Sequence, residues 1–588
     1  MSDGQASHQN TLKPGPFAWL RSKQTLKWIE IGLAVLVSLM IGILFAVFAQ
    51  GGPNSSDITL YMNVGMNGIK MPFILNRYFH VFLQTIFIEL APTPVQGYHL
   101  FWGFIVGLNT CLIYLTARKA LKRSNPIHGV LAVLIFFSFS AVAETAGVIV
   151  VDFTAMTMIT LFFFVYLLSL NQGHHNPWLV GALGFVLYLA FKTKETTLPV
   201  AVLLVGLGWV NGKSFDFRRL LKNALWVICG GLAGIVFFGL LSWIFLGDPF
   251  FGLRISEWRE FLSTYAVYSS RVLETMNALE TGNLDDWYKG YWFEFALLPF
   301  LFYLISGIKL NRKVGYARKL LWLVPLAYTL LLIVLINNRL GYEIRFGLPV
   351  LPVLAVLAPQ FIDIRWPENK RKRVRLLLYL GVGLVIAVGV RVLLRLIVPA
   401  RGLDLGSVVT LMYYPILITV LLASLFLFRE KLLWQVVNAL ILFSLMVSPV
   451  ASNLRSMFIF RENQAQFNEV ILPFMEFEDK INFTKNTMFY MTYDVFDQHE
   501  LKIGKNVDEL VALFNVYFDT NATRENFTFK EAPTAISGDL LSGSYDYALV
   551  TMDDWIAMQE PEEKLIQVKA AFEVVFGSGG DFVLLVAE

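Results

Sequence analysis

Cysteine and charged residues are both scarce in this sequence. Only 2 of its 588 residues are cysteines and only 16% are charged, whereas 56% are hydrophobic. A typical soluble domain has about 25% charged residues, so the composition excludes a soluble protein of several domains. Both cysteines, Cys111 and Cys229, lie in apolar runs, and we therefore expect no framework of structural disulfides.

Long apolar runs are what the sequence has in abundance. A helix that crosses a bilayer needs about 20 residues, and runs near that length recur along most of the chain. They predict a polytopic α-helical membrane protein with about 13 transmembrane helices, the first of which lacks the cleavage pattern of a signal peptide. The predicted spans cover residues 28–49, 97–117, 127–143, 153–170, 178–191, 197–210, 224–246, 291–308, 320–337, 347–363, 376–398, 408–428 and 432–450.

Basic residues predict how these spans are oriented. Lys and Arg cluster before the first span and at residues 118–123, 213–222, 309–319 and 370–375. With the spans above, every cluster lies on one side of the membrane, and positive residues accumulate in cytoplasmic loops. We therefore expect the N-terminus in the cytoplasm and the C-terminus outside.

One apolar stretch has to be left out of this count. Residues 72–90 are long enough to cross the membrane, but they contain Arg77 and His80, and counting them as a span would place the next basic cluster outside. We expect instead a helix that lies along the outer interface, where arginine and histidine can reach lipid headgroups.

The last part of the chain differs in kind. From residue 453 onward it has 23 Asp and Glu residues against 10 Lys and Arg, and no run of spanning length. Segments 488–493, 545–551 and 581–586 have strand-like patterns and residues 561–576 a helical one, which predicts a small α/β domain. The predicted organisation is a cytoplasmic segment (1–27), a transmembrane domain (28–452) with outer loops 50–96 and 247–290, and a soluble extracytoplasmic domain (453–588).

Two lysines and a glutamate interrupt the apolar sequence in the middle of the transmembrane part. Lys192, Lys194 and Glu195 stand between two apolar segments of only about 14 residues each, short for a span. A charge in hydrocarbon costs several kcal/mol, so we expect a recessed turn that faces a water-filled cavity on the outer side. A lysine pair there would suit a phosphate, because an ammonium group is a compact charge with three donors.

Asp57 follows the first span in the segment NSSDITLYMNVG. A carboxylate just above a membrane cavity could act as a general base that removes a proton from an acceptor hydroxyl or amine. Asp57 or Ser56 could equally be the N-cap of the helix that follows. The residues alone leave both interpretations open.

These features together resemble the GT-C superfamily of membrane glycosyltransferases, in particular the protein O-mannosyltransferases and the lipid A aminoarabinose transferases (glycosyltransferase families 39 and 83). The resemblance is carried by Asp57 with Tyr61 after the first span, the segment 72–90, the Lys-Glu turn, and the run RFGLPVLPVLAVLAP (345–359). It implies a GT-C fold and an enzyme that transfers a sugar from a polyprenyl-phosphate donor to an acceptor on the outer face, with inversion of the anomeric centre.

The resemblance also implies roles for single residues. Asp57 matches the catalytic aspartate, Lys194 matches the basic residue directed at the lipid phosphate, and Arg345 lies where a late basic residue would assist. Members of the family often carry a second acidic residue beside the first, but Asp57 is followed by Ile58. This departure argues against a metal site built from paired carboxylates.

The chemistry of the outer face agrees with a lipid-carried donor. Nucleotide sugars are cytoplasmic, so an enzyme that works outside needs a donor whose leaving group is a lipid phosphate, and cationic side chains stabilise the charge that develops on it. Arg391 and Arg395 lie one turn apart on the span 376–398 and are candidates for this contact. Their alternative use is to extend to the outer headgroups.

Further candidates line the expected outer cavity. Glu144 and Asp152 bracket the turn between the third and fourth spans; they could support the cavity wall, bind the acceptor, or belong to a solvated turn. Asp285 and Asp286 in the outer loop 247–290 could hold a sugar ring beside a tryptophan. The remaining cavity candidates are Tyr61, Arg77, His80 and Glu195.

The main alternative function is a transporter or flippase for a lipid-linked or small anionic substrate, which would also need charges in a cavity. The charges gather on the outer side rather than at the midplane, which favours the enzyme. The sequence does not identify a cofactor; it leaves a divalent metal possible but does not favour one, and we expect no nucleic-acid partner. The expected partners are the polyprenyl-phosphate donor, membrane lipid, and a glycan, lipid or protein acceptor, and the expected location is the plasma (inner) membrane of the cell envelope.

Overall fold

The structure is a computed structural model of the whole chain. Most of the stretch between residues 23 and 263 is described, together with parts of the later spans and the C-terminal strands. The described residues are 23–48, 56–120, 126–139, 142, 150–172, 175–210, 214–263, 319–324, 350–361, 371, 374, 477, 480–481, 487–492, 511, 514–516, 520–530, 540–541, 545–557, 562–576 and 582–587.

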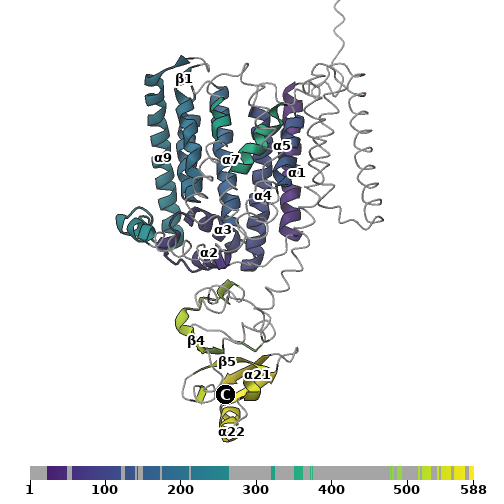
Figure 1. Cartoon of the computed structure of the whole chain (residues 1–588), viewed down its shortest axis with the longest axis vertical. Helices are drawn as coiled ribbons and strands as arrows, with labels where there is room; N and C mark the ends of the chain where they lie inside the picture. The colour runs from purple at the N-terminus through teal and green to yellow at the C-terminus, as the bar shows by residue number, and fades with distance from the viewer. Residues whose placement is uncertain are drawn as a thin grey trace, which may run out of the picture.

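A bundle of helices forms the body of the molecule (Figure 1). Within the described part of the chain, 4 helices are long and apolar enough to cross a membrane: α1 (Lys23–Phe48), α4 (Pro94–Ala120), α7 (Val150–Asn171) and α9 (Phe217–Leu246). Between them run the shorter α5 (Pro126–Ser138), α8 (Pro177–Phe191) and the 3-10 helix η3 (Glu195–Gly208). These elements coincide with the predicted spans up to residue 246.

The geometry of η3 explains how a short apolar segment reaches across the bundle. η3 has 14 residues and contains Pro199. A 3-10 helix rises about 2.0 Å per residue, against about 1.5 Å for an α-helix, so this segment extends about 28 Å. That is close to the hydrocarbon thickness of a bilayer, about 30 Å.

Glycines let neighbouring helices approach closely. A Cβ atom on Gly184 of α8 would lie 1.8 Å from the carbonyl oxygen of Val227, and one on Gly230 of α9 would lie 1.7 Å from that of Gly181. Only glycine fits at such contacts, and small residues at helix interfaces are typical of membrane proteins. The backbones of α8 and α9 are therefore packed closely together beside the charged turn that joins α8 to η3.

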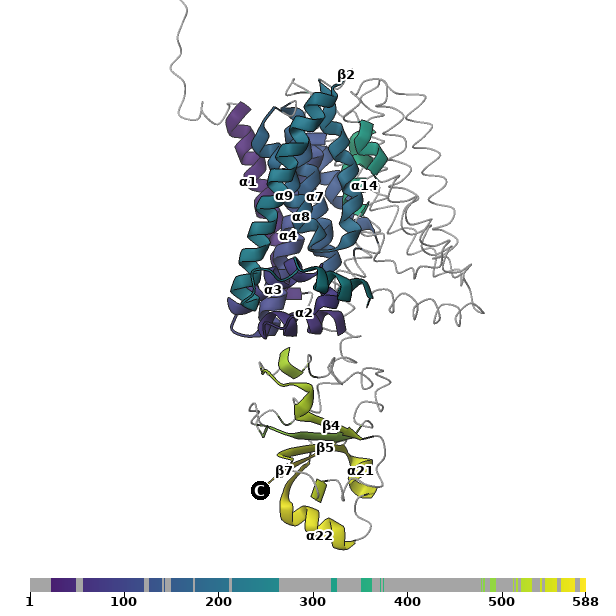
Figure 2. The ribbon, with the colours of Figure 1, turned by 90° about the vertical axis from the view of Figure 1, so that its left-hand side faces the viewer.

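Short helices close one end of the bundle. Helix α2 (Ser56–Met66), the single turn η2 (Pro72–Ile74) and helix α3 (Tyr78–Glu89) lie together at the end that carries the C-terminal strands (Figures 1 and 2). The hairpin β1 (Trp209–Val210) and β2 (Ser214–Phe215) lies at the opposite end. We call the end with α2 and α3 the site end.

The stretch 72–90 does not form a membrane span, as predicted, because α3 has only 12 residues. The expectation that its polar residues reach lipid headgroups is wrong. Tyr78, Val81 and Phe82 are fully buried, and His80 is only 1% exposed. Helix α3 packs into the protein on nearly all sides, so its polar side chains face other protein groups.

The C-terminal part contains a five-stranded sheet with the strand order β4-β3-β5-β7-β6. β3 pairs in parallel with β4 and β5, whereas β7 pairs antiparallel with β5 and β6. The strands are β3 (Phe489–Thr492), β4 (Phe527–Lys530), β5 (Tyr547–Thr551), β6 (Phe572–Phe576) and β7 (Phe582–Ala587), and the helices around them are η9 (Arg524–Asn526), α21 (Met552–Ala557) and α22 (Glu562–Ala571).

Three predicted strands are confirmed as β3, β5 and β7, and the predicted helix 561–576 is only partly right. α22 ends at Ala571, and β6 follows directly. Phe572, Val574 and Val575 are residue types that favour strands, and pairing with β7, with Val574 opposite Leu585, outweighs the local helical pattern. Of the later predicted spans, the structure describes only η4 (Leu320–Trp322), α14 (Leu351–Leu357) and η6 (Ala358–Phe361).

Candidate functional site

The KTKE turn joins α8 to η3 at the site end. Lys192 is the C-cap of α8, and Lys194 is the extended N-cap residue of η3. The backbone carbonyl of Lys192 accepts a hydrogen bond from the Phe79 amide at 3.1 Å. The turn is therefore attached to the start of α3.

Lys194 forms a buried ion pair with Asp152. The Lys194 ammonium contacts Oδ1 of Asp152, and the two side chains are 4% and 0% exposed. The alternative that Asp152 belongs to a solvated turn is therefore wrong. In the described part of the chain, Oδ2 of Asp152 has no hydrogen-bond partner. The carboxylate offsets the charge of Lys194 and holds the turn against α7.

A second ion pair lies beside the first. Nη1 and Nη2 of Arg77 donate to the Glu195 carboxylate at 2.5 and 3.2 Å, and Nδ2 of Asn76 donates to it at 2.7 Å. Arg77 is the N-cap residue of α3. The pair therefore ties the start of α3 to the start of η3, and it is electrically neutral.

His80 and Tyr61 connect α2 and α3 to this polar centre. Nδ1 of His80 lies 2.9 Å from Oγ1 of Thr154, and its ring is edge-on to Tyr61, with 5.6 Å between the ring centres. Burial, together with the charge of Arg77, lowers the pKa of His80 to about 3. His80 is therefore neutral at physiological pH. It contributes a hydrogen bond to Thr154 and a ring contact with Tyr61 rather than a positive charge.

Asp57 lies in the first turn of α2, one helical turn before Tyr61. Residues four apart share a helix face. Because α2 lies beside α3 at the site end (Figure 1), the fold brings the backbone of Asp57 to the end of the bundle that holds the start of α3 and, through the Phe79–Lys192 hydrogen bond, the KTKE turn.

Lys192 has a different environment from Lys194. Its side chain is buried, its ammonium donates to the carbonyl oxygen of Gly252 at 3.1 Å, and it lies over the rings of Phe238 and Trp258 at 4.7 and 4.9 Å from their centres. None of the ion pairs among the described residues includes Lys192. Burial lowers the pKa of this turn residue to about 8, although the charge of Glu257 opposes the shift.

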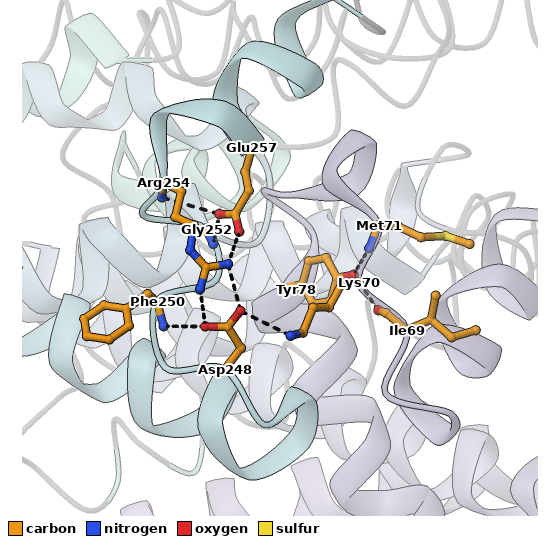
Figure 3. Close-up of polar contacts among 9 residues, drawn as sticks. All are labelled: Ile69, Lys70, Met71, Tyr78, Asp248, Phe250, Gly252, Arg254 and Glu257. Carbon is orange, nitrogen blue, oxygen red and sulfur yellow. Dashed lines mark hydrogen bonds and ion pairs between the residues drawn. The ribbon is translucent and has the colours of Figure 1, made fainter.

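The loop after α9, which contains Gly252, is held in place by a network of hydrogen bonds and ion pairs (Figure 3). Gly247 ends α9 in the left-handed conformation, at φ 65°. Asp248 then accepts two hydrogen bonds from Arg254, both 2.8 Å long, and one of 3.2 Å from Lys70. Because Lys70 lies between α2 and α3, this cluster joins the loop after α9 to the segment between α2 and α3.

Glu257 shapes the part of the loop that touches Lys192. Its carboxylate accepts hydrogen bonds from the Gly252 amide at 2.6 Å and from Nη1 of Arg254 at 3.1 Å. Gly252 has φ 81°, and a Cβ atom there would lie 2.8 Å from the Lys192 ammonium. The Gly252 carbonyl also accepts a hydrogen bond of 3.1 Å from the Trp258 indole.

Four charged residues of this part of the structure were not predicted from the sequence: Lys70, Asp248, Arg254 and Glu257. The available signal was the charged segment GDPFFGLRISEW (247–258), which follows directly after a span. It begins with the Gly-Asp-Pro pattern of a turn, and its charges alternate in sign.

The predicted residues fall into two groups. Those that the structure brings together at the site end are Tyr61, Arg77, His80, Asp152, Lys192, Lys194 and Glu195, with the backbone of Asp57. Those that lie outside the described residues are Glu144, Asp285, Asp286, Arg345, Arg391 and Arg395.

Lys192 is the lysine of the KTKE turn that takes part in none of the ion pairs among the described residues. Arg77 and Lys194 are each matched by a carboxylate, so Lys192 supplies the excess positive charge among these residues. Within the described residues, no group of three or more His, Cys, Asp or Glu side chains is placed to hold a metal ion.

No protein-family model matches the chain, and no curated protein matches its sequence. Its structure is similar to that of ArnT from Cupriavidus metallidurans bound to undecaprenyl phosphate, with a TM-score of 0.48, 14% identity, and coverage of 96% of this chain and 98% of that chain. It is also similar to the archaeal oligosaccharyltransferase AglB from Archaeoglobus fulgidus in complex with an inhibitory peptide and a dolichol-phosphate, with a TM-score of 0.45, 11% identity, and coverage of 95% and 74%.

Proposed function

We propose that this protein is an integral membrane glycosyltransferase that transfers a sugar from a polyprenyl-phosphate donor to an acceptor on the outer face of the membrane. The observation that carries the proposal is Lys192, a buried cation outside all the ion pairs of the described residues, at the end of the bundle where Asp57 stands in the first turn of α2. The sequence features shared with the GT-C superfamily support the same function.

The transfer needs a cation for the leaving group. When the bond between the anomeric carbon and the phosphate oxygen breaks, the electron pair remains on the phosphate. The Lys192 ammonium has three donor positions, one of which is used by the Gly252 carbonyl. A fixed charge in a site of low dielectric stabilises such a developing anion strongly.

The acceptor needs a base on the opposite side of the sugar ring. Asp57 takes the proton of an acceptor hydroxyl or amine as its oxygen or nitrogen attacks the anomeric carbon, which inverts the configuration there. The acceptor is a glycan, a lipid or a protein, and the reaction takes place on the side of the C-terminal sheet.

The two buried ion pairs have a supporting role in this mechanism. Asp152–Lys194 and Arg77–Glu195 hold α7, η3 and α3 in one arrangement around the turn. Lys194 is a second candidate for contacting the phosphate, although its charge is partly offset by Asp152. Arg345, Arg391 and Arg395 are proposed as further phosphate contacts, and Glu144, Asp285 and Asp286 as acceptor contacts.

Lipid binding by single variants tests the proposal. Polyprenyl phosphate should bind wild-type protein in detergent, and Lys192→Met should lower the affinity about 10- to 100-fold, because a hydrogen-bonded charge is lost. The control is Lys222→Met, which removes an exposed lysine from the far end of α9. Equal affinity in Lys192→Met and wild type would refute the role of Lys192.

Asp57→Asn separates an enzyme from a flippase. In an assay with polyprenyl-phosphate-linked hexoses and pentoses, this variant should bind the donor normally but transfer no sugar. Normal turnover would refute the general base. Movement of the intact donor across vesicles without any transfer would favour the flippase.

A further inference from the structure

The C-terminal part of the chain touches the helix that carries Asp57. Nδ2 of Asn515 donates a hydrogen bond of 2.9 Å to Oδ1 of Asn63 on α2, across 452 positions of sequence. The same Oδ1 accepts a bond of 2.8 Å from Nδ2 of Asn67, the residue that directly follows α2. Asn63 lies fewer than two turns after Asp57 on a helix of 11 residues.

The side chain of Asn515 is fully engaged. Its Oδ1 accepts hydrogen bonds from the Thr520 hydroxyl and the Ala522 amide, both 2.7 Å long. Its Nδ2 also donates to the Ala522 carbonyl at 2.9 Å. Asn515 is completely buried, and a buried amide with all its groups satisfied holds one geometry. The Asn515 side chain therefore holds its own loop together through Thr520 and Ala522, and in that single geometry it also reaches Asn63 of α2.

Neighbouring residues extend this contact on both sides. Val516 is fully buried and belongs to the same apolar core as Tyr61, Met62 and Val64 of α2. On the other side, the Phe514 ring packs edge-on against Phe489 of β3, at 6.0 Å, and Phe527 of β4, at 5.4 Å. A continuous set of packed side chains thus runs from the sheet to α2.

We propose that Asn515 and Val516 are positioning residues, through which the C-terminal sheet holds α2, and with it Asp57, at the site end of the bundle. The effect on catalysis rests on the proposed function, whereas the contact between the sheet and α2 does not. The segment before α2 contains two glycines and a proline (Gly51, Gly52 and Pro53), residues that do not continue a helix from α1 into α2. A short helix without such support would fray, because helices of this length are marginal by themselves.

Hydrogen exchange of the α2 amides tests the contact without any substrate. Asn63→Ala removes the acceptor of the Asn515 bond and should speed the exchange of the α2 amides about tenfold or more, because the helix opens more often. Asn67→Ala is the matched control, since Asn67 contacts Asn63 but makes no hydrogen bond to Asn515 among the described residues, and it should have a much smaller effect. Equal exchange in Asn63→Ala and wild type would overturn the proposal.

Kinetics then test the positioning role. With the polyprenyl-phosphate-linked sugar that is active in the assay above, Asn63→Ala should lower kcat about tenfold or more and change the donor KM less than about twofold, because a misplaced base slows chemistry without weakening donor binding. A short reducible cross-linker between Asn63→Cys and Asn515→Cys, with Cys111→Ser and Cys229→Ser, should restore kcat, and reduction should remove it. An unchanged kcat in Asn63→Ala would overturn the positioning role.

The two proposals fail in different ways. Suppose that the paired cysteines cross-link and the wild-type α2 amides exchange slowly, but the wild-type protein transfers no sugar from any donor. This outcome would refute the proposed function and leave the contact between the sheet and α2 established. Failure of the paired cysteines to cross-link, with single-cysteine variants as controls for labelling, would overturn the contact even in an active enzyme.

Discussion

The Lys192 ammonium lies 3.1 Å from the carbonyl oxygen of Gly252, although the two residues are 60 positions apart. Between them run η3 and the whole of α9, which cross the bundle and return to the site end. The contact therefore joins the charged turn before η3 to the loop that follows α9. It places a lysine with a lowered pKa among aromatic rings at the proposed donor site.

Binding of polyprenyl phosphate should weaken as the pH rises through about 8. The pKa of Lys192 is lowered to about 8, so the lysine is charged below that pH and neutral above it. An ordinary lysine, with a pKa of about 10.4, would stay charged throughout this range. We expect the affinity to fall about tenfold between pH 7 and pH 9, since the protonated fraction falls by that factor.

Lys192→Arg is the control for this pH profile. Arginine keeps its charge to a much higher pH, so binding by this variant should be flat between pH 7 and pH 9. The measurement is the Kd of polyprenyl phosphate at each pH. A fall of the same size in Lys192→Arg would assign the titration to another group.

Glu257→Gln should shift the midpoint of that profile to lower pH. The charge of Glu257 raises the pKa of Lys192 against the effect of burial, and glutamine removes the charge but retains an acceptor for the Gly252 amide. Glu260→Gln, an exposed position on the next turn, should leave the midpoint unchanged. A shift to higher pH in Glu257→Gln would contradict the assigned electrostatics.

Gly252→Ala and Gly247→Ala should destabilise the protein similarly but differ in lipid binding. Both glycines have positive φ, 81° and 65°, where a Cβ atom costs about 1–2 kcal/mol. A Cβ on Gly252 would meet the Lys192 ammonium, whereas one on Gly247 has nothing within 4 Å. Thermal unfolding should give similar losses, and only Gly252→Ala should weaken polyprenyl-phosphate binding. Equal binding by both variants would mean that the loop does not control Lys192.

Lys194→Met and Asp152→Asn should each destabilise the protein by about 3–5 kcal/mol, because each leaves a buried charge without a counter-charge. The double variant Lys194→Met/Asp152→Leu should recover most of that loss, since apolar residues of similar volume can replace a buried ion pair. Thermal unfolding in detergent measures the stability. A stable double variant that has lost polyprenyl-phosphate binding would show that Lys194 itself contacts the phosphate.

Composition and local pattern determined the class of this protein and much of its helical layout. Bilayer crossing demands long apolar segments whatever the tertiary structure, so α1, α4, α5, α7, α8, η3 and α9 coincide with predicted spans. The same reasoning excluded residues 72–90 as a span. It also identified the KTKE turn as unusual, because placing a charged side chain in hydrocarbon costs free energy unless a counter-charge or a ligand offsets it.

The identity of those partners was decided only by the tertiary structure. Lys192 and Lys194 are two residues apart and chemically identical, and no local pattern distinguishes them. The fold places Lys194 against Asp152 of α7 and Lys192 against Gly252 and Trp258 beyond α9. The burial of His80 and the bond between Asn515 and Asn63 likewise depend on which elements pack together. Apolar periodicity records that a residue is buried, whereas the electrostatic role of a charged residue depends on neighbours that are distant in sequence.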